Sequence, residues 1–316
     1  MNTVYFLVQQ TMFFSIPLLI VALGGMFSER SGVVNIALEG IMIMGAFSSI
    51  LFINIVQSSG AALLLLLAVL IAAAVGVLVS MAHAYASINM KADQVISGTA
   101  INMFAPAFAI FAARMIRSVQ QIPFSNTFRI TKVPVLGDIP VLGPLLFQNT
   151  YITTYLGFAV LAVSAVVLYK TRFGLRLRAC GEHPQAADSV GVNVYRMRYA
   201  GVAISGALAG VGGLVFVVPT STNFNATVAG YGFLALAVLI FGQWRPSRIL
   251  FAAFFFGLMK TVASAYSGIP FLANLGIPND VYKMVPYVAT LIVLAFTSKN
   301  SMAPRAEGIP YDKGSR

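Results

Sequence analysis

AALLLLLAVLIAAAVGVLVSMAHAYA, residues 61–86, contains no Asp, Glu, Lys or Arg. A helix needs roughly 20 apolar residues to cross the hydrocarbon core of a bilayer, and this run is long enough. The whole chain of 316 residues shares this character, because 59% of it is hydrophobic and only 9% is charged. Its mean hydropathy is +0.86. We therefore predict an all-α, polytopic helical membrane protein whose residues 1–316 form a single transmembrane domain.

Further apolar runs lie along the chain on both sides of this one, and they predict about 8–10 transmembrane helices. The first run starts at Tyr5 with no Lys or Arg before it, and we expect it to be retained as a span rather than removed as a signal peptide. Two of the segments, 33–55 and 230–243, are the weakest and are candidates for broken or re-entrant helices. The predicted segments are 5–26, 33–55, 61–86, 95–113, 151–169, 199–218, 230–243, 249–267 and 282–298.

The chain also shows a weak internal symmetry. Residues 31–53 and 230–257 are both apolar stretches interrupted by glycine. Repeat-built transporters place such stretches at equivalent positions of two halves. We therefore expect two loosely repeated halves.

Lys and Arg are unevenly distributed between the predicted spans, and cytoplasmic loops of membrane proteins carry an excess of them. Residues 170–198 form a basic loop, and alternation of the spans places four further segments on the same side: 27–32, 87–94, 244–248 and 299–316. These five segments hold 14 of the 20 Lys and Arg residues. The loop 114–150, on the other side, holds 4. This predicts an external N-terminus, an internal C-terminus and an extracytoplasmic loop over 114–150 in a multi-pass membrane protein.

Several functional classes are excluded by the sequence. The net charge of +11 does not indicate a nucleic-acid-binding protein, because the basic residues lie between spans rather than on one face or in a tail. No HExxH, CxxC or GxSxG pattern is present, and the lone cysteine, Cys180, permits no intrachain disulfide. We therefore expect no catalytic residue, no metal site and no ATP site or other cofactor site in this chain.

Four polar residues inside or beside the predicted spans are candidates for a substrate pathway: Asn35, Glu39, Asn102 and Lys260. A charge at the bilayer centre costs about 2.5–3.5 kcal/mol, so Glu39 and Lys260 need a polar cavity or each other. Asn102 lies in SGTAINMF, where hydroxyl groups, an amide and an aromatic ring suit a sugar or a nucleoside better than an ion. A structural ion pair and a helix–helix hydrogen bond remain open as alternatives.

RLRACGEHPQAADSVGVNVYRMR, residues 176–198, concentrates polar residues in this apolar chain. Within it we predict a short helix over 184–190, because Pro184 suits the first helical position and Gly191 the position after the end. On that helix Ala186, Ala187 and Val190 would share one face. Such a short helix is not stable alone in water, so it must pack on something. An amphipathic connector on the membrane surface and a docking element for a partner protein are both open.

Two longer stretches resemble a known family. TRFGLRLRACGEHPQAADSVGVNVYRMRYAGVAISGALAGVGG, residues 171–213, resembles the cytoplasmic loop and following helix of bacterial ABC-importer permeases of the ribose, branched-chain amino acid and nucleoside type. In it Gly206 and Gly210 also predict a close helix–helix contact. ERSGVVNIALEGIMIMGAF, residues 29–47, looks like the signature of the nucleoside branch of that family.

The resemblance implies a transmembrane permease subunit of an ATP-binding cassette importer in the bacterial plasma membrane, which takes up nucleosides by alternating access. It also implies protein partners: two ATPase subunits that bind ATP and Mg, a second related permease chain in a heterodimer, and an extracytoplasmic substrate-binding lipoprotein. The chain would contact membrane lipids and would not bind nucleic acid. The short helix becomes the coupling helix that the ATPases contact, with the residues Gly181, Glu182, Pro184, Ala186, Ala187 and Gly191. A permease for a sugar or a branched-chain amino acid, and an ion-coupled secondary transporter with Glu39 as proton carrier, are the alternatives.

Overall fold

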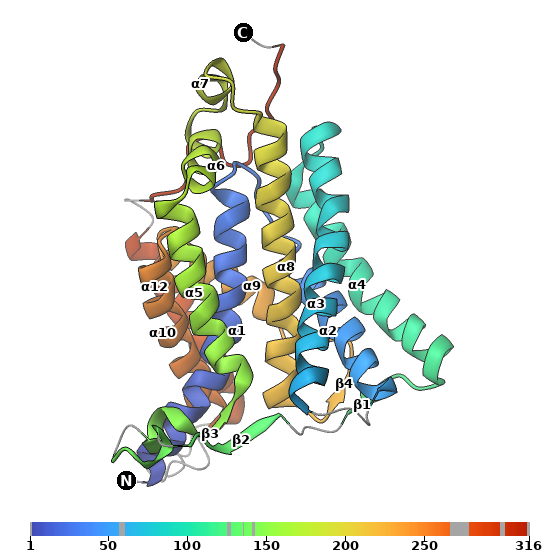
Figure 1. Cartoon of the computed structure of the whole chain (residues 1–316), viewed down its shortest axis with the longest axis vertical. Helices are drawn as coiled ribbons and strands as arrows, with labels where there is room; N and C mark the ends of the chain where they lie inside the picture. Colours follow the sequence, from blue (N-terminus) through green and yellow to red (C-terminus); the bar gives the residue numbers. More distant parts are fainter. Residues whose placement is uncertain are drawn as a thin grey trace.

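The structure, a computed structural model, is a bundle of helices that run mostly along one direction (Figure 1). It describes residues 2–56, 61–124, 128–134, 136–140, 143–265, 278–297 and 301–314. The α-helices are α1 (Asn2–Glu29), α2 (Leu38–Ile55), α3 (Ala61–Ala84), α4 (Gln94–Arg117), α5 (Ile152–Lys170), α6 (Arg172–Glu182), α7 (Pro184–Ser189), α8 (Val194–Thr220), α9 (Tyr231–Phe241), α10 (Pro246–Ala265) and α12 (Asn279–Thr297). Short elements are η1 (Tyr85–Asn89), η2 (Leu136–Asp138), η3 (Gly143–Phe147), β1 (Ile122–Pro123), β2 (Arg129–Lys132), β3 (Gln148–Tyr151) and β4 (Asn223–Phe224).

Every predicted apolar segment contains a helix, in the predicted order. In the described residues, 7 helices are long and apolar enough to cross a membrane. The helix in segment 230–243, α9, is shorter and spans only Tyr231–Phe241. The prediction of a polytopic helical membrane protein is therefore confirmed.

The two ends of the bundle carry different features. The end with α6, α7 and the C-terminal tail (residues 301–314) is here called the loop end, and the end with the N-terminus and the β-strands is called the strand end (Figure 1). Ion pairs Arg30–Glu182 at 3.5 Å and Lys91–Asp312 at 2.6 Å join basic segments at the loop end. The predicted grouping of the basic segments on one side is thus confirmed.

Glycine allows α8 to lie at the centre of the bundle, against α3 and α2. A Cβ added to Gly76 of α3 would lie 2.1 Å from the carbonyl oxygen of Gly206, and one added to Gly45 of α2 would lie 2.4 Å from the Cα of Gly210. Such close approach of backbones requires small residues, as is common between membrane helices. The close helix contact predicted from residues 205–213 is confirmed.

The strand end is covered by the loop between α4 and α5. Strand β1 of this loop pairs antiparallel with β4, which precedes α9, and β2 pairs with β3. Side chains of the transmembrane helices hold the loop: Asn54 donates to the carbonyl of Pro123, and Gln9 donates to that of Pro144. The loop is therefore fastened to α1, α2 and the segment before α9 rather than hanging free.

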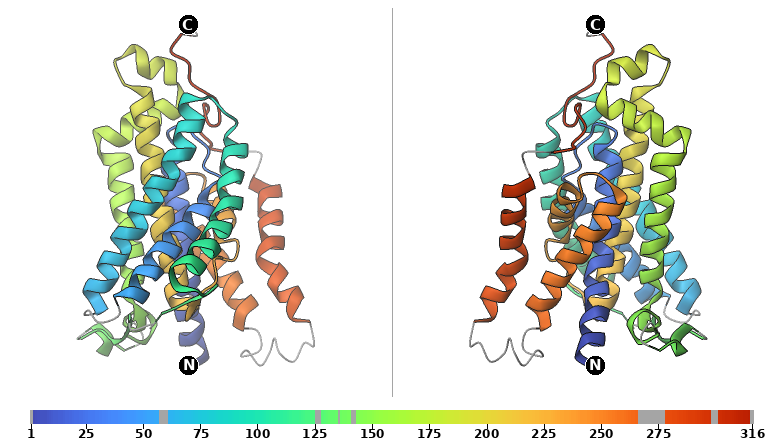
Figure 2. Two further views of the ribbon diagram at one scale, coloured as in Figure 1. Left: turned by 90° about the vertical axis from the view of Figure 1, so that its right-hand side faces the viewer. Right: turned by 90° about the vertical axis from the view of Figure 1, so that its left-hand side faces the viewer.

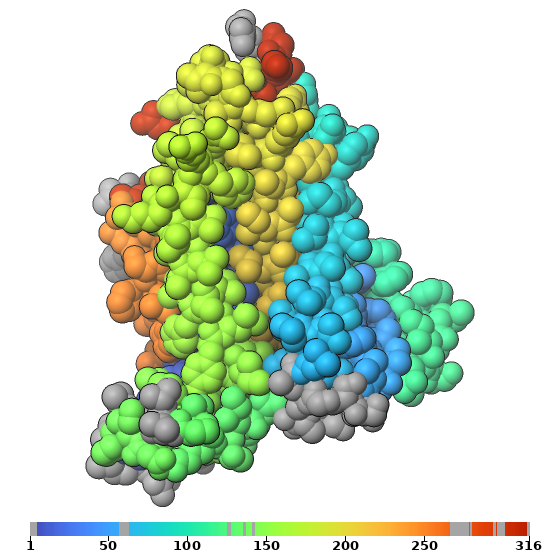
Figure 3. All heavy atoms as spheres, viewed as in Figure 1, coloured from blue at the N-terminus to red at the C-terminus, as the bar shows by residue number. Residues whose placement is uncertain are grey.

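Two helices, α4 and α12, lie at the edge of the bundle. Helix α12 stands apart from the central helices (Figure 2), and α4 leans away from them toward the strand end (Figure 1). The strand-end half of α4 also projects from the surface in the space-filling view (Figure 3). Large apolar side chains of α4, including Met103, Phe104 and Phe111, are exposed on it.

Candidate transport and coupling sites

Helices α2 and α9 both begin in the interior of the bundle, and Glu39 joins their first turns. One carboxylate oxygen of Glu39 accepts from the backbone N–H of Gly230 at 2.9 Å, and the other accepts from that of Gly232 at 2.6 Å. The unpaired N–H groups at a helix N-terminus favour a negative charge, so this placement is stabilising. A Cβ on Gly232 would lie 2.3 Å from the backbone nitrogen of Glu39, so glycine is needed for the contact. We call this meeting point of the two helix starts the junction.

Asn102 of α4 holds the segment that leads into α2. Its side-chain oxygen accepts from the N–H of Gly40 at 2.7 Å, and its amide donates to the carbonyl of Ile36 at 2.8 Å. Non-helical backbone at membrane depth must be hydrogen-bonded by protein groups, and Asn102 supplies two of these bonds. The side chain of Gln94 accepts from the N–H of Val34 at 2.7 Å in the same way. The helix–helix hydrogen bond left open by the sequence is therefore present.

Lys260 does not pair with Glu39 among the described residues. Its ammonium group lies 5.6 Å from the ring centroid of Tyr231 and 5.8 Å from that of Tyr287. These are cation–π distances. Tyr231 follows Gly230 in the chain, so Lys260 lies against the junction without an ion pair to it. The Tyr231 hydroxyl is buried and has no hydrogen-bond partner in the part of the chain that the structure describes.

Asn35 lies apart from the junction, in the turn before α2. Its amide donates to the hydroxyl of Ser205 on α8 at 2.8 Å, and both side chains are fully buried. The structure therefore brings Glu39, Asn102 and Lys260 to the junction, while Asn35 fastens the turn to α8. That these residues line a substrate pathway stays a prediction.

The polar loop between α5 and α8 folds into two short helices, α6 and α7. Pro184 is the first residue of α7, as predicted, and the helix ends at Ser189, one residue before the predicted end. Gly191 follows with φ +84°, a conformation that glycine adopts without steric cost. Hydrogen bonds to the side chains of Thr171 and Asn193 cap α6 and α8 on either side.

The two alanines of α7 face different ways, which corrects the expectation of one shared face with Val190. Ala187 is buried in a cluster with Cys180, Val194 and Tyr311, whereas Ala186 is exposed and Val190 is 77% exposed. The reason is that the inner side of α7 packs on α6 and α8, and Tyr311 of the C-terminal tail joins their cluster, which the local helix pattern does not reveal. Burial raises the pKa of the Cys180 thiol to about 11, so it stays protonated and apolar.

The remaining coupling candidates divide in the same way. Gly181 and Pro184 are buried, and a Cβ on Gly181 would lie 2.4 Å from the carbonyl oxygen of Arg30. These two residues and Ala187 give the loop its shape. The predicted residues that reach the surface are Ala186, Gly191 and, in part, Glu182.

The C-terminal tail ties the loop to the bundle. The N–H of Ala306 donates to the carbonyl of Gly181 at 2.8 Å, and that of Gly308 donates to the carbonyl of Gly32 at 3.2 Å. Arg198 at the start of α8 donates to the carbonyl of Ile309 at 3.0 Å. Sequence reasoning missed this role, because the tail shows neither a periodic pattern nor a motif.

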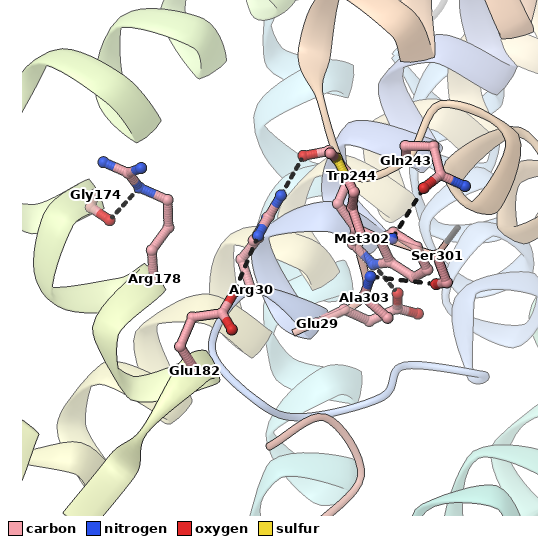
Figure 4. A network of polar contacts seen from close by, with 10 residues as sticks. All are labelled: Glu29, Arg30, Gly174, Arg178, Glu182, Gln243, Trp244, Ser301, Met302 and Ala303. Carbon is pink, nitrogen blue, oxygen red and sulfur yellow. Dashed lines mark hydrogen bonds and ion pairs between the residues drawn. The ribbon is translucent and has the colours of Figure 1, made fainter. Parts of the chain in front are cut away.

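Glu29 and Arg30, at the end of α1, connect the loop to the turn between α9 and α10 (Figure 4). The Arg30 guanidinium lies 3.5 Å from the carboxylate of Glu182 and donates to the carbonyl of Trp244 at 3.1 Å. The indole of Trp244 donates in turn to the carboxylate of Glu29. The N–H of Met302 donates to the side chain of Gln243 at 2.9 Å, which adds the tail. We call this network, with the tail, the loop-end joint.

Comparison with known proteins places the chain in a family. The model of the branched-chain amino acid transport system/permease component family matches residues 7–294. The chain belongs to this family of permeases. With its apolar helices, this makes it a multi-pass protein of the plasma membrane and a transport subunit.

Curated relatives cover nearly the whole chain. The guanosine ABC transporter permease NupQ of Bacillus subtilis is 46% identical over 98% of this chain and 97% of its own length. The nucleoside ABC transporter permease NupC of Lactococcus lactis is 41% identical over 99% of this chain and 98% of its own. A putative glucose ABC transporter permease of Haloferax volcanii, TsgC13, is 30% identical over 88% of this chain and 87% of its own. No solved structure matches the chain.

Proposed function

We propose that this chain is the membrane-spanning subunit of an ATP-binding cassette importer for nucleosides. The observation that carries the proposal is the likeness to two nucleoside permeases, at 46% and 41% identity over nearly the full chain. The resemblance of residues 29–47 to the nucleoside branch supports it. This stretch also contains Glu29 and Arg30 of the loop-end joint and Glu39 of the junction. The glucose relative, at 30% identity, keeps a sugar as the second candidate.

ATP and Mg would be bound and hydrolysed by separate ATPase subunits at the loop end, which the Lys and Arg distribution assigns to the cytoplasm. The exposed residues Ala186, in α7, and Val190, directly after it, are the contact surface that the loop offers. A push on α7 reaches Glu182, and from there Arg30 and the turn at Trp244. Helix α9 leads from that turn to the junction. ATP-driven movement and access to the junction would thus be two sites coupled through one two-state element.

A second permease chain would complete the pathway. The ring of Tyr287 lies beside the ammonium group of Lys260 at the junction. Tyr287 is 52% exposed, and Lys260 itself is only partly buried. A charged side chain in a membrane faces the protein interior or a water-filled cavity rather than lipid. A second, related chain opposite α4, α9 and α12 would supply that cover. An extracytoplasmic lipoprotein would deliver substrate at the strand end.

Reconstituted transport tests the proposal. The chain is co-expressed with candidate ATPase, second permease and lipoprotein subunits from its own genome, and uptake of labelled guanosine into proteoliposomes is measured with and without ATP. We expect ATP-dependent guanosine uptake that other nucleosides inhibit and that glucose and leucine do not. Glucose uptake without nucleoside uptake would make it a sugar permease. Uptake by the purified chain alone, driven by a proton gradient, would make it a secondary transporter.

A further inference from the structure

A cavity of about 410 Å³ lies beside α9, between the junction and the loop end. This volume is within the roughly 300–1,000 Å³ of small-molecule sites in proteins. Val34 and Ile36, from the turn before α2, form one wall. Leu236 and Ile240, one helical turn apart on α9, form another. Because Leu236 lies one turn beyond Gly232 of the junction, the cavity begins about one turn from the junction and runs along α9 toward the loop end.

Polar groups occupy the loop-end side of the cavity. Trp244 and Glu29 line it, and the tail contributes Ser301 and Glu307. Figure 4 shows Trp244 and Glu29 side by side, with the tail residue Ser301 close to them. Trp244 is 4% exposed and Glu29 is 4% exposed, so the site is built from side chains held inside the protein.

One buried carboxyl in this set can accept a further hydrogen bond. The carboxyl of Glu307 shares a hydrogen bond with that of Glu29, and its Oε2 atom is shielded from solvent and accepts from no N–H or hydroxyl group within the described residues. A carboxylate has about four acceptor sites, so a ligand that donates to it would be favoured. Burial raises the pKa of Glu307 to about 7, and Glu29 and Arg30 are the charged groups that face it. At pH 8 this carboxyl is therefore mostly an acceptor.

We propose that this cavity holds the base of a nucleoside on its way to the loop end, with the base against Trp244 and an N–H of its pairing edge donating to Glu307. The proposal rests on the proposed function and names an inner site for that substrate. Aliphatic walls and an indole suit a planar ring, whereas they would leave most sugar hydroxyls unpaired. The carboxylate of Glu307 would repel the carboxylate of an amino acid.

Binding in the cavity can be followed by intrinsic fluorescence, because Trp244, which lines it, is the single tryptophan of the sequence. The purified full chain in detergent is titrated at pH 8 with guanosine, and tryptophan emission is recorded. Purine riboside is the matched ligand, since it keeps the purine ring and the ribose but has no N–H donor on the pairing edge. We expect a saturable change in emission with guanosine and at least about tenfold weaker binding of purine riboside, equivalent to about 1.4 kcal/mol.

Two variants sharpen the test. Glu307→Leu removes the acceptor and is expected to reduce the preference for guanosine over purine riboside to less than about twofold. Thr99→Val is the matched control, because Thr99 is exposed and bonds only within its own helix, and it should bind as the native chain does. If Glu307→Leu does not fold, the comparison of the two ligands on the native chain still decides.

The proposal is overturned if guanosine gives no saturable change in emission, or if guanosine and purine riboside bind with equal affinity. ATP-driven guanosine uptake by the reconstituted importer, with no emission change, would reject the cavity as a site while leaving the proposed function intact. Absence of both uptake and emission change, for guanosine and for other nucleosides, would reject both.

Discussion

The junction and the loop-end joint both connect parts of the chain that are far apart in sequence, but they do so with different bonds. At the junction, Glu39 and Asn102 bind backbone N–H and carbonyl groups in the interior. At the loop-end joint, side chains also bind one another, and Glu182 is 41% exposed in its ion pair with Arg30. The Lys91–Asp312 pair, at the same end, is 43% and 49% exposed.

This difference has an energetic consequence. Hydrogen bonds to charged groups contribute about 1.5–3 kcal/mol each, and more is lost when a buried partner stays unpaired. Exposed ion pairs contribute about 0–1 kcal/mol. Elements that move in a functional cycle come from the less stable parts of a protein. The comparison therefore assigns the junction to the fixed frame of the permease and the loop-end joint to its adjustable part.

The largest effect is expected at Glu39. Glu39→Ala removes both bonds to the start of α9, and we expect a loss of about 3 kcal/mol or more in the free energy of unfolding. Glu39→Gln keeps the volume but sets an amide donor against a backbone N–H, so about half that loss is expected, together with impaired transport. Thermal unfolding in detergent and ATP-driven uptake measure the two effects. If the Glu39→Gln variant has normal stability and normal uptake, Glu39 does not belong to the fixed frame.

The next effect is expected at Asn102. Asn102→Leu leaves the N–H of Gly40 and the carbonyl of Ile36 without their partner, and a loss of about 2 kcal/mol or more is expected. Thr99→Val, on the same helix, removes only an exposed hydroxyl that bonds to the carbonyl of Val95. It should change stability by less than about 0.5 kcal/mol. Equal unfolding midpoints for the two variants would show that Asn102 does not hold α2.

Much of the frame could be predicted from the sequence, since each apolar run became a helix in the predicted order. The two weakest segments, 33–55 and 230–243, were those whose helices begin in the interior. Their glycines were visible, and Gly232 is where α9 lies directly against the backbone of Glu39 in α2. The local sequence pattern was sufficient to predict these helices, because hydropathy and the spacing of small residues can be read from residues that are close together in the chain.

The loop-end joint was not predictable in the same way. Trp244 and Glu29 are 215 positions apart, and Arg30 and Trp244 are 214 apart, so no periodicity links them. The one available signal was that Glu29 and Arg30 stand at the start of the stretch that resembles nucleoside permeases. The opposite orientation of Ala186 and Ala187 was hidden for the same reason, because packing on α6, α8 and the tail decides which alanine is covered.

The surface of α7 offers a test of the adjustable part. Ala186→Arg places a charge on the exposed side of the helix and should weaken co-purification with the ATPase by tenfold or more, about 1.4 kcal/mol, without lowering the unfolding midpoint. Ala187→Arg forces the same charge into the cluster with Cys180 and Tyr311, so it should lower the midpoint as well. Undiminished ATPase binding by Ala186→Arg would place the contact elsewhere on the loop.

The sharpest test of the comparison is expected at the Arg30–Glu182 pair, where the effect on stability is small. Glu182→Gln should cost less than about 1 kcal/mol, because the pair is partly exposed. Arg30→Met also loses the bond to the carbonyl of Trp244 and should cost somewhat more. If the joint transmits movement, Arg30→Met should raise the number of ATP molecules hydrolysed per nucleoside imported, and Glu182→Gln should raise it less. A purely structural pair would lower the amount of assembled importer and leave that ratio unchanged, and the loop-end joint would then belong to the frame like the junction.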